Sequence, residues 1–142
     1  MIMASFKKIL VPLDGSASSF RGLDRAILLA RFLHATITGL YVVPIVLPTK
    51  NTPVSSYEKF FLNNTVKFMR KAKTRAAKNG ILFHDKVVYG DEGVAIVCFA
   101  NRNNFDMIVI GSRGRGAAKE IFLGSTSNYV LHKSKIPVLI VK

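Results

Sequence analysis

The sequence predicts an α/β protein with a doubly wound, open parallel sheet of five strands in the order 3-2-1-4-5 and helices on both faces. Short apolar segments alternate with segments in which apolar residues recur at helical spacing, which is typical of βαβ units with right-handed crossovers. The strand-like segments are apolar on both faces, as in a sheet that helices cover on both sides. With 142 residues, 49% hydrophobic and 20% charged, the chain is long enough for one domain and too short for two, so residues 1–142 are expected to form a single domain.

The first half of the chain predicts strands at residues 8–13 and 36–43, each followed by a helix. The first strand ends at the turn pair Asp14-Gly15, and the hydroxyl of Ser16, Ser18 or Ser19 can cap the helix that follows. Apolar residues recur at helical spacing through residues 20–33. A proline-rich loop at 44–53 precedes a long helix at 57–78, which Asn79-Gly80 ends.

The second half predicts strands at residues 81–89, 105–110 and 136–141. Gly90-Asp91-Glu92 opens the helix between the first two of these strands. In the predicted order the chain reverses direction across the sheet between its first and fourth strands, so the loops after them flank the crevice where doubly wound proteins bind ligands. The loop that begins at Asp14 and the loop that begins at Gly111 are therefore expected to form one site.

The second of these loops, residues 111–127, has the composition of a phosphate site. It contains four glycines and the arginines Arg113 and Arg115, and it leads through Ser125 and Ser127 into a helix. Glycines let the backbone approach an anion, and free amides at a helix start supply donors. The loop lacks the Gly-Lys-Ser/Thr ending of a P-loop and the GxGxxG register. The alternative is a flexible loop in which Ser125 or Ser127 only caps the helix.

The spacing Gly111-x2-Gly114-x9-Gly124-Ser125 resembles the ATP-binding branch of the universal stress protein family. The opening strand with its Asp-Gly-Ser turn, residues 40–44 and the final strand fit the same family, so the resemblance covers nearly the whole chain. It implies a regulatory module that binds ATP, or AMP, with Mg²⁺ or Mn²⁺ as the accompanying metal. The alternative is an accessory nucleic-acid-binding or assembly protein of the same fold.

The resemblance also implies which residues hold the nucleotide. Asp14 and Val42 would line the nucleoside pocket beside Pro12, and the loop glycines and serines would surround the phosphates and ribose. The residue chemistry adds a hydroxyl at Thr126 and a cation at Arg113, although solvated loop arginines are an equal alternative. The expected nucleotide-binding set is Pro12, Asp14, Val42, Gly111, Arg113, Gly114, Gly124, Ser125, Thr126 and Ser127.

Acidic residues near the motif are few. Asp14 can accept from a ribose hydroxyl or help hold a divalent metal, and its alternative role is an Asx-turn. Glu92 stands where many family members have proline and is expected to affect only a helix start. Because only Asp14 and Glu120 are acids near the motif, we expect no catalytic residues and at most slow ATP hydrolysis, far below the ~10 per second of a typical enzyme.

The net charge of +13, from 21 basic and 8 acidic residues, favours anionic partners. One window within the long helix holds six cations and no acid: Lys67, Arg70, Lys71, Lys73, Arg75 and Lys78. A solvated helix face is one interpretation, and a surface for nucleic acid or for an acidic protein is the other. For nucleic acid, we expect only weak, nonspecific and strongly salt-dependent binding. No apolar run approaches the ~18 residues that span a bilayer, so no membrane insertion is expected.

The remaining features concern location and assembly. The only cysteine, Cys98, fits a reducing cytoplasm and is expected to be buried. The three histidines show no metal-ligand spacing, and the N-terminus lacks the order of a signal peptide. The strand that begins at Ile136 and ends at Val141 is predicted at a sheet edge, where it can pair with its copy, and the family commonly dimerises this way. We therefore expect a cytoplasmic homodimer.

Overall fold

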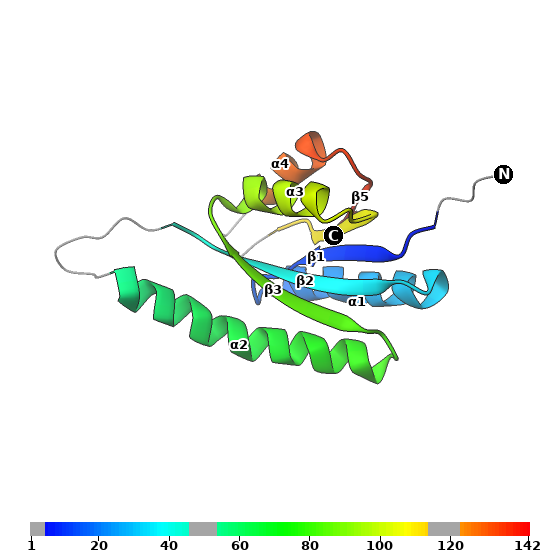
Figure 1. Ribbon diagram of the computed structural model, residues 1–142, viewed down its shortest axis with the longest axis horizontal. Coiled ribbons are helices and arrows are strands. Elements are labelled where there is room, and N and C mark those ends of the chain that lie inside the picture. Colours follow the sequence, from blue (N-terminus) through cyan, green and yellow to red (C-terminus); the bar gives the residue numbers. More distant parts are fainter. Residues whose placement is uncertain (1–4, 46–53, 114–122) are drawn as a thin grey trace.

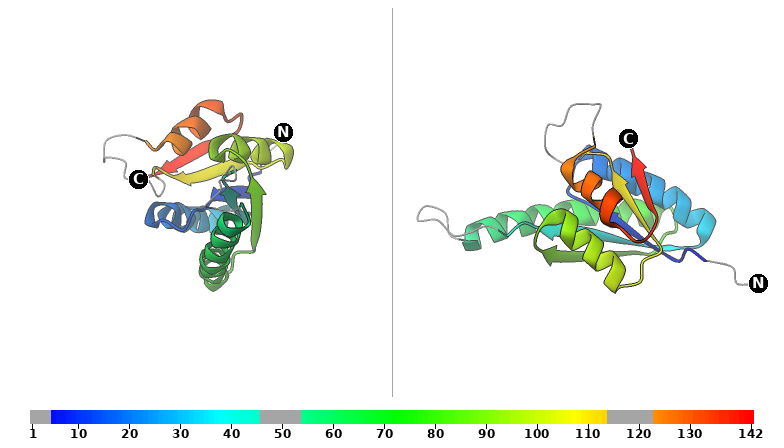
Figure 2. Two further views of the ribbon diagram at one scale, coloured as in Figure 1. Left: turned by 90° about the vertical axis from the view of Figure 1, so that its left-hand side faces the viewer. Right: turned by 90° about the horizontal axis from the view of Figure 1, so that it is seen from above.

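The computed structural model describes residues 5–45, 54–113 and 123–142. Within these ranges a parallel five-stranded sheet has the order β3-β2-β1-β4-β5, which confirms the predicted fold class. Helices α1 and α2 cover one face of the sheet, and α3 and α4 cover the other (Figure 1; Figure 2). The elements are β1 (Lys8–Pro12), α1 (Ala17–Leu33), β2 (Thr36–Val43), α2 (Val54–Lys78), β3 (Phe83–Tyr89), α3 (Glu92–Arg102), β4 (Met107–Gly111), α4 (Ser125–Lys133) and β5 (Val138–Val141).

The three central strands carry the core. Ile9 on β1 lies opposite Ile37 on β2 and Met107 on β4, so β1 pairs on both sides. One core layer packs between the sheet and α1 and α2, and includes Leu23 and Phe68. The layer on the other face packs against α3 and α4. Because β1 and β4 are neighbours that lead to opposite halves of the sheet, their carboxyl ends flank the switch point where ligands bind in such folds.

Polar side chains set the element ends. The Oγ of Ser16 accepts from the amide of Ser19 at 3.1 Å, so of the three candidate serines it is Ser16 that caps α1. Asp91 caps α3 in the same way by accepting from the amide of Val94. Asp106, just before β4, accepts from the amides of Lys7 and Lys8 at 2.9 Å each and joins the starts of β1 and β4.

The sheet edges differ from the prediction. β3 was expected to be apolar and covered on both faces, yet residues 84–87 are exposed, because α2 packs on one face of β3 while α3 packs on β2 and α4. The last strand covers four residues rather than six. Cys98 is exposed rather than buried, because Ile96, Val97 and Ala100 form the sheet-facing side of α3 and Cys98 falls outside that arc.

No helix in the described part of the chain is both long and apolar enough to cross a membrane.

Candidate nucleotide-binding site

A cavity of about 550 Å³ lies at the carboxyl ends of β1, β2 and β4 and at the start of α4. Nine of the ten residues predicted for nucleotide binding line it: Pro12, Asp14, Val42, Gly111, Arg113, Gly124, Ser125, Thr126 and Ser127. The tenth, Gly114, lies outside the described residues, as do Arg115 and Glu120. The two loops that the sequence predicts to converge therefore meet at one cavity.

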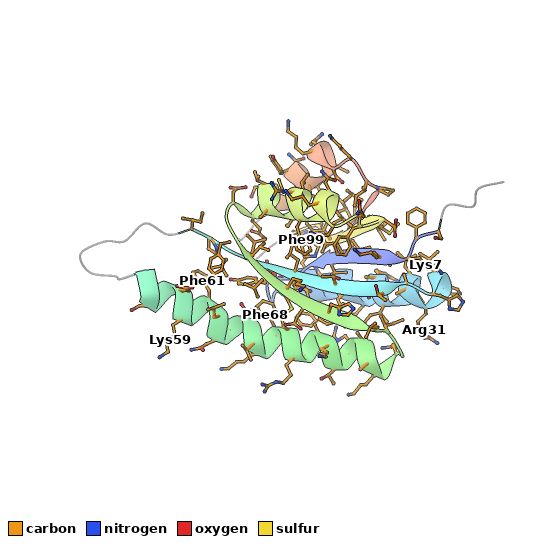
Figure 3. The ribbon with its side chains drawn as sticks, viewed as in Figure 1. Lys7, Arg31, Lys59, Phe61, Phe68 and Phe99 are labelled. Atoms are coloured by element: carbon orange, nitrogen blue, oxygen red, sulfur yellow. The ribbon has the colours of Figure 1, made fainter. Side chains whose placement is uncertain are left out.

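One wall of the cavity is apolar. Pro12, Val42 and Ile110 come from the ends of three adjacent strands, so the wall is as rigid as the sheet. Tyr41 and Phe61 close it from the side of α2, and Figure 3 shows Phe61 directed from α2 toward the sheet. An apolar wall of this kind suits a nucleobase, which has two apolar faces and polar edges.

The opposite end of the cavity is built to attract an anion. The N-cap of α4 is Gly124, which has no side chain to accept from the first-turn amides, and no acid stands in that turn. In the described part of the chain no side chain caps these amides, so the positive end of the helix dipole faces the cavity. Arg113 lines the same region and adds a guanidinium. The arrangement is that of a phosphate-binding helix start.

Ser127 holds the two ends of the glycine-rich loop together. Its side chain is 2% exposed, and its hydroxyl donates to the carbonyls of Ser112 at 2.9 Å and Gly124 at 3.1 Å. The amide of Gly124 also donates to the carbonyl of Ser112 at 2.8 Å. From the sequence, the Ser127 hydroxyl is expected to donate to the ligand, whereas in the structure it donates to these two main-chain carbonyls. It thereby fixes α4 against the end of β4.

Gly111 is required for a reason that the sequence does not show. The expectation was that a side chain here would block the phosphates. A Cβ on Gly111 would instead lie 2.5 Å from the carbonyl oxygen and 2.6 Å from the Oγ of Ser18. A Cβ on Gly22, one turn further along α1, would lie 3.2 Å from the amide nitrogen of Gly111, which is also tighter than ordinary packing. The two glycines let the start of α1 lie directly on the end of β4, which brings the first loop beside the second.

Asp14 is held at the cavity by its own turn. Its Oδ1 accepts from the amide of Ser16 at 2.9 Å, and its amide lies 3.5 Å from the Oγ of Ser19. The Asx-turn and the ligand-binding role are therefore compatible, because the turn orients the carboxylate at the cavity wall. Within the described residues no group of three His, Cys, Asp or Glu side chains could hold a metal by itself, so a divalent ion would need phosphate ligands as well.

Glu92 is the residue that sequence reasoning missed. Its side chain is exposed as a whole, but its carboxyl end lines the cavity and accepts from the hydroxyl of Thr126. Burial of this end raises the pKa of Glu92, and the nearby charges of Asp14 and Asp91 raise it further, against the opposing effect of the Thr126 hydrogen bond. The expectation that Glu92 affects only a helix start is wrong. The signal was its place after Gly90-Asp91, at the carboxyl end of a strand.

The sequence pattern of one family matches residues 5–142. The chain belongs to the universal stress protein family. A universal stress protein of Methanocaldococcus jannaschii is 32% identical over 141 residues, which cover 96% of this chain and 82% of that protein. The solved structure of universal stress protein UspA from Lactobacillus plantarum matches with a TM-score of 0.88 at 23% identity and covers 99% of this chain and 100% of that one.

A universal stress protein family member from Arabidopsis thaliana, solved with AMP bound, has a TM-score of 0.73 at 17% identity and covers 96% of this chain and 91% of that one. At these identities the two solved structures show that this universal stress protein has the fold of its family.

Proposed function

We propose that this universal stress protein is a regulatory module that binds ATP in the cavity between β1, β4 and α4. The main observation behind this proposal is the start of α4, whose uncapped amides face a cavity that also has an apolar wall and an aspartate. The volume of about 550 Å³ lies within the ~300–1,000 Å³ of small-molecule sites. The AMP bound to the family member from Arabidopsis thaliana supports a nucleotide as the class of ligand.

In this proposal each part of the nucleotide occupies its own region of the cavity. The base lies against Val42 and Pro12, the phosphates lie at the start of α4 near Arg113, and the ribose lies between them, where Asp14 can accept from its hydroxyls. Mg²⁺ or Mn²⁺ would be held by the phosphates with Asp14 as a protein ligand. Signalling then depends on whether the site is filled.

Calorimetric titration with ATP tests this proposal, with and without Mg²⁺, on the wild type, Asp14→Asn and Asp85→Asn. Asparagine at 14 keeps an oxygen for the Ser16 amide but removes the charge that the ribose hydroxyls or the metal would use. We expect roughly tenfold weaker binding for this variant, since a hydrogen bond to a charged group contributes about 1.5–3 kcal/mol. Asp85 is exposed on β3 away from the cavity, so its variant controls for net charge and should bind as the wild type.

Two outcomes contradict the proposal. The first is no heat of binding with folded wild-type protein at millimolar ATP. The second is tighter binding by Asp14→Asn, which would mean that the carboxylate repels the nucleotide rather than holding it.

The edge strand β5 supports a homodimer as part of this proposal. β5 pairs only with β4 within the described residues, and Leu139 on it is 38% exposed. Pairing of two such edges through residues 136–141 would cover the leucine and extend the sheet. Light scattering should give about twice the 15.7 kDa of the chain, and Leu139→Lys should give the monomer. Leu28→Lys, at a leucine 44% exposed on α1, is the matched control and should stay dimeric.

A further inference from the structure

The positive charge of the protein is concentrated on one face of the sheet. Helices α1 and α2 together carry ten Lys and Arg residues and two acidic residues, a net charge of +8 out of +13. Helices α3 and α4, on the other face, carry two Lys and Arg residues and one acidic residue. The two layers lie on opposite sides of the sheet (Figure 2), so one helical layer is strongly cationic and the other is nearly neutral.

The cations of this layer are directed outward in two rows. The first row lies on α1 and the second on α2, and Figure 3 shows Arg31 and Lys59 directed away from the sheet, whereas Phe68 is directed toward it. The exposed cations are Arg21, Arg25 and Arg31 on α1, and Lys59, Lys67, Arg70, Lys71, Lys73 and Lys78 on α2. Both rows belong to helices that the core holds in place, so the charges form a fixed pattern.

The two acids of this layer do not neutralise the rows. Arg75, between the helices, forms a salt bridge with Asp24 at 2.9 Å. Glu58, the other acid, accepts from the hydroxyl of Tyr89 at 2.9 Å and lies toward β3. Lys71 and Arg75 both lie 4.9 Å from the ring centre of Phe20, so these contacts also tie α2 to α1. Among the described residues, the exposed cations have no carboxylate within salt-bridge distance.

Several observations favour a nucleic-acid duplex as the occupant. The apolar side of α2, with Phe68, Met69 and Ala72, is buried against the sheet and cannot enter a lipid bilayer. A helix of 25 residues is about 37 Å long, close to one turn of B-DNA. Helices α1 and α2 lie against each other, so their cations form one continuous surface that can meet several phosphates of a duplex together.

We propose that the outer face of α1 and α2 binds double-stranded nucleic acid without sequence preference, through phosphate contacts from both rows of cations. This function is separate from the nucleotide cavity, which opens at the strand ends. The surface extends beyond the run that begins at Lys67, because it needs the arginines of α1 as a second row.

Fluorescence anisotropy with a labelled 24-base-pair DNA of mixed sequence tests the proposal between 50 and 200 mM NaCl. Three triple variants each remove three charges. The first is Arg21→Gln with Arg25→Gln and Arg31→Gln on α1, and the second is Lys67→Gln with Arg70→Gln and Lys73→Gln on α2. The matched control on the other side of the sheet is Arg102→Gln with Lys133→Gln and Lys135→Gln, all exposed in the wild type.

Each phosphate contact contributes about −0.9 to the slope of log affinity against log salt. We expect a slope of about −5 for six contacts in the wild type, and a slope shallower by about 3 in either variant of the α1–α2 face. The control should keep the wild-type slope. Calorimetry with Mg-ATP should give the same affinity for all three variants and the wild type, which separates this face from the cavity.

Four results would overturn the proposal: a wild-type slope near zero, an equal loss in the control, an unchanged slope in the α1 variant, or tighter binding to vesicles with about 30% phosphatidylserine than to the duplex. The last would assign the face to a membrane surface. The wild-type slope and the vesicle comparison need no substitution, so they decide the question even if a variant folds poorly.

Discussion

The contact between Gly111 and α1 makes a quantitative prediction about Gly111→Ala. The new Cβ would meet three atoms of Ser18, the carbonyl oxygen at 2.5 Å, the Oγ at 2.6 Å and the carbonyl carbon at 2.7 Å. Two of these belong to the main chain of the first turn of α1, which cannot move aside without moving the helix. The side chain of one alanine should therefore shift the start of α1 away from β4.

The expected cost lies at the upper end of the range for overpacking. Inserting a methyl group into a packed site costs about 1–3 kcal/mol, and three close contacts, two of them with main-chain atoms, favour about 3 kcal/mol. For a chain of this length, 1 kcal/mol corresponds to roughly 3–4 °C, so the melting temperature should fall by about 10 °C. With an m-value near 2 kcal/mol/M, the urea midpoint should fall by about 1.5 M.

Urea unfolding followed by circular dichroism measures the loss of stability in Gly111→Ala, Ser18→Ala and the double variant. Removing the Ser18 hydroxyl relieves only one of the three contacts, so the double variant should remain destabilised to a similar extent. Full recovery in the double variant would show that the hydroxyl rather than the main chain sets the limit. A loss under about 0.5 kcal/mol in Gly111→Ala would refute the close-packing explanation altogether.

Three further predictions concern the cavity. The pKa of Glu92 is raised above its ordinary 4.5 in the folded protein. Between pH 4.5 and this raised pKa the folded state therefore binds more protons than the unfolded state, and its stability falls as the pH rises. Glu92→Gln should therefore be more stable than the wild type above the raised pKa and equal to it in stability well below pH 4.5. Thermal melts across pH 3–8 check this, and an equal gain in stability at every pH would contradict it. Ser127→Ala should lower the free energy of unfolding by about 1–2 kcal/mol and weaken ATP binding, because the buried hydrogen bond to the Ser112 carbonyl is lost. An unchanged urea midpoint would count against this hydrogen bond as what holds the loop ends together. Phosphate release from Mg-ATP should stay far below ~10 per second, and a rate in that range would show that a catalytic group is present.

Much of the fold follows from local chemistry that the sequence displays. β2 has the predicted bounds, because its β-branched and apolar run ends at Pro44. A serine caps α1 as predicted, although only the structure selects Ser16 from the three candidates. Alternating strands and helices with right-handed crossovers allow only a few doubly wound orders, and the one that suits two halves of this length, 3-2-1-4-5, is the order observed.

The differences arise where the outcome depends on neighbours distant in sequence. Whether β3 is covered depends on where α3 settles, and α3 lies over β2 and α4. Glu92 reaches the cavity because α3 begins beside Thr126, a proximity that composition cannot show. Gly111 is constrained by Ser18, 93 positions earlier, which only the packing of α1 on β4 reveals.

The hydrogen bonds from Ser127 and Gly124 to the carbonyl of Ser112 hold the two ends of the glycine-rich loop together. Since both ends are fastened to each other, the position of α4 relative to the sheet does not depend on how many residues lie between them. The start of α4 is therefore held to the end of β4 by hydrogen bonds of its own, so the amides that would meet a phosphate keep a constant position relative to the strand ends that would meet the base.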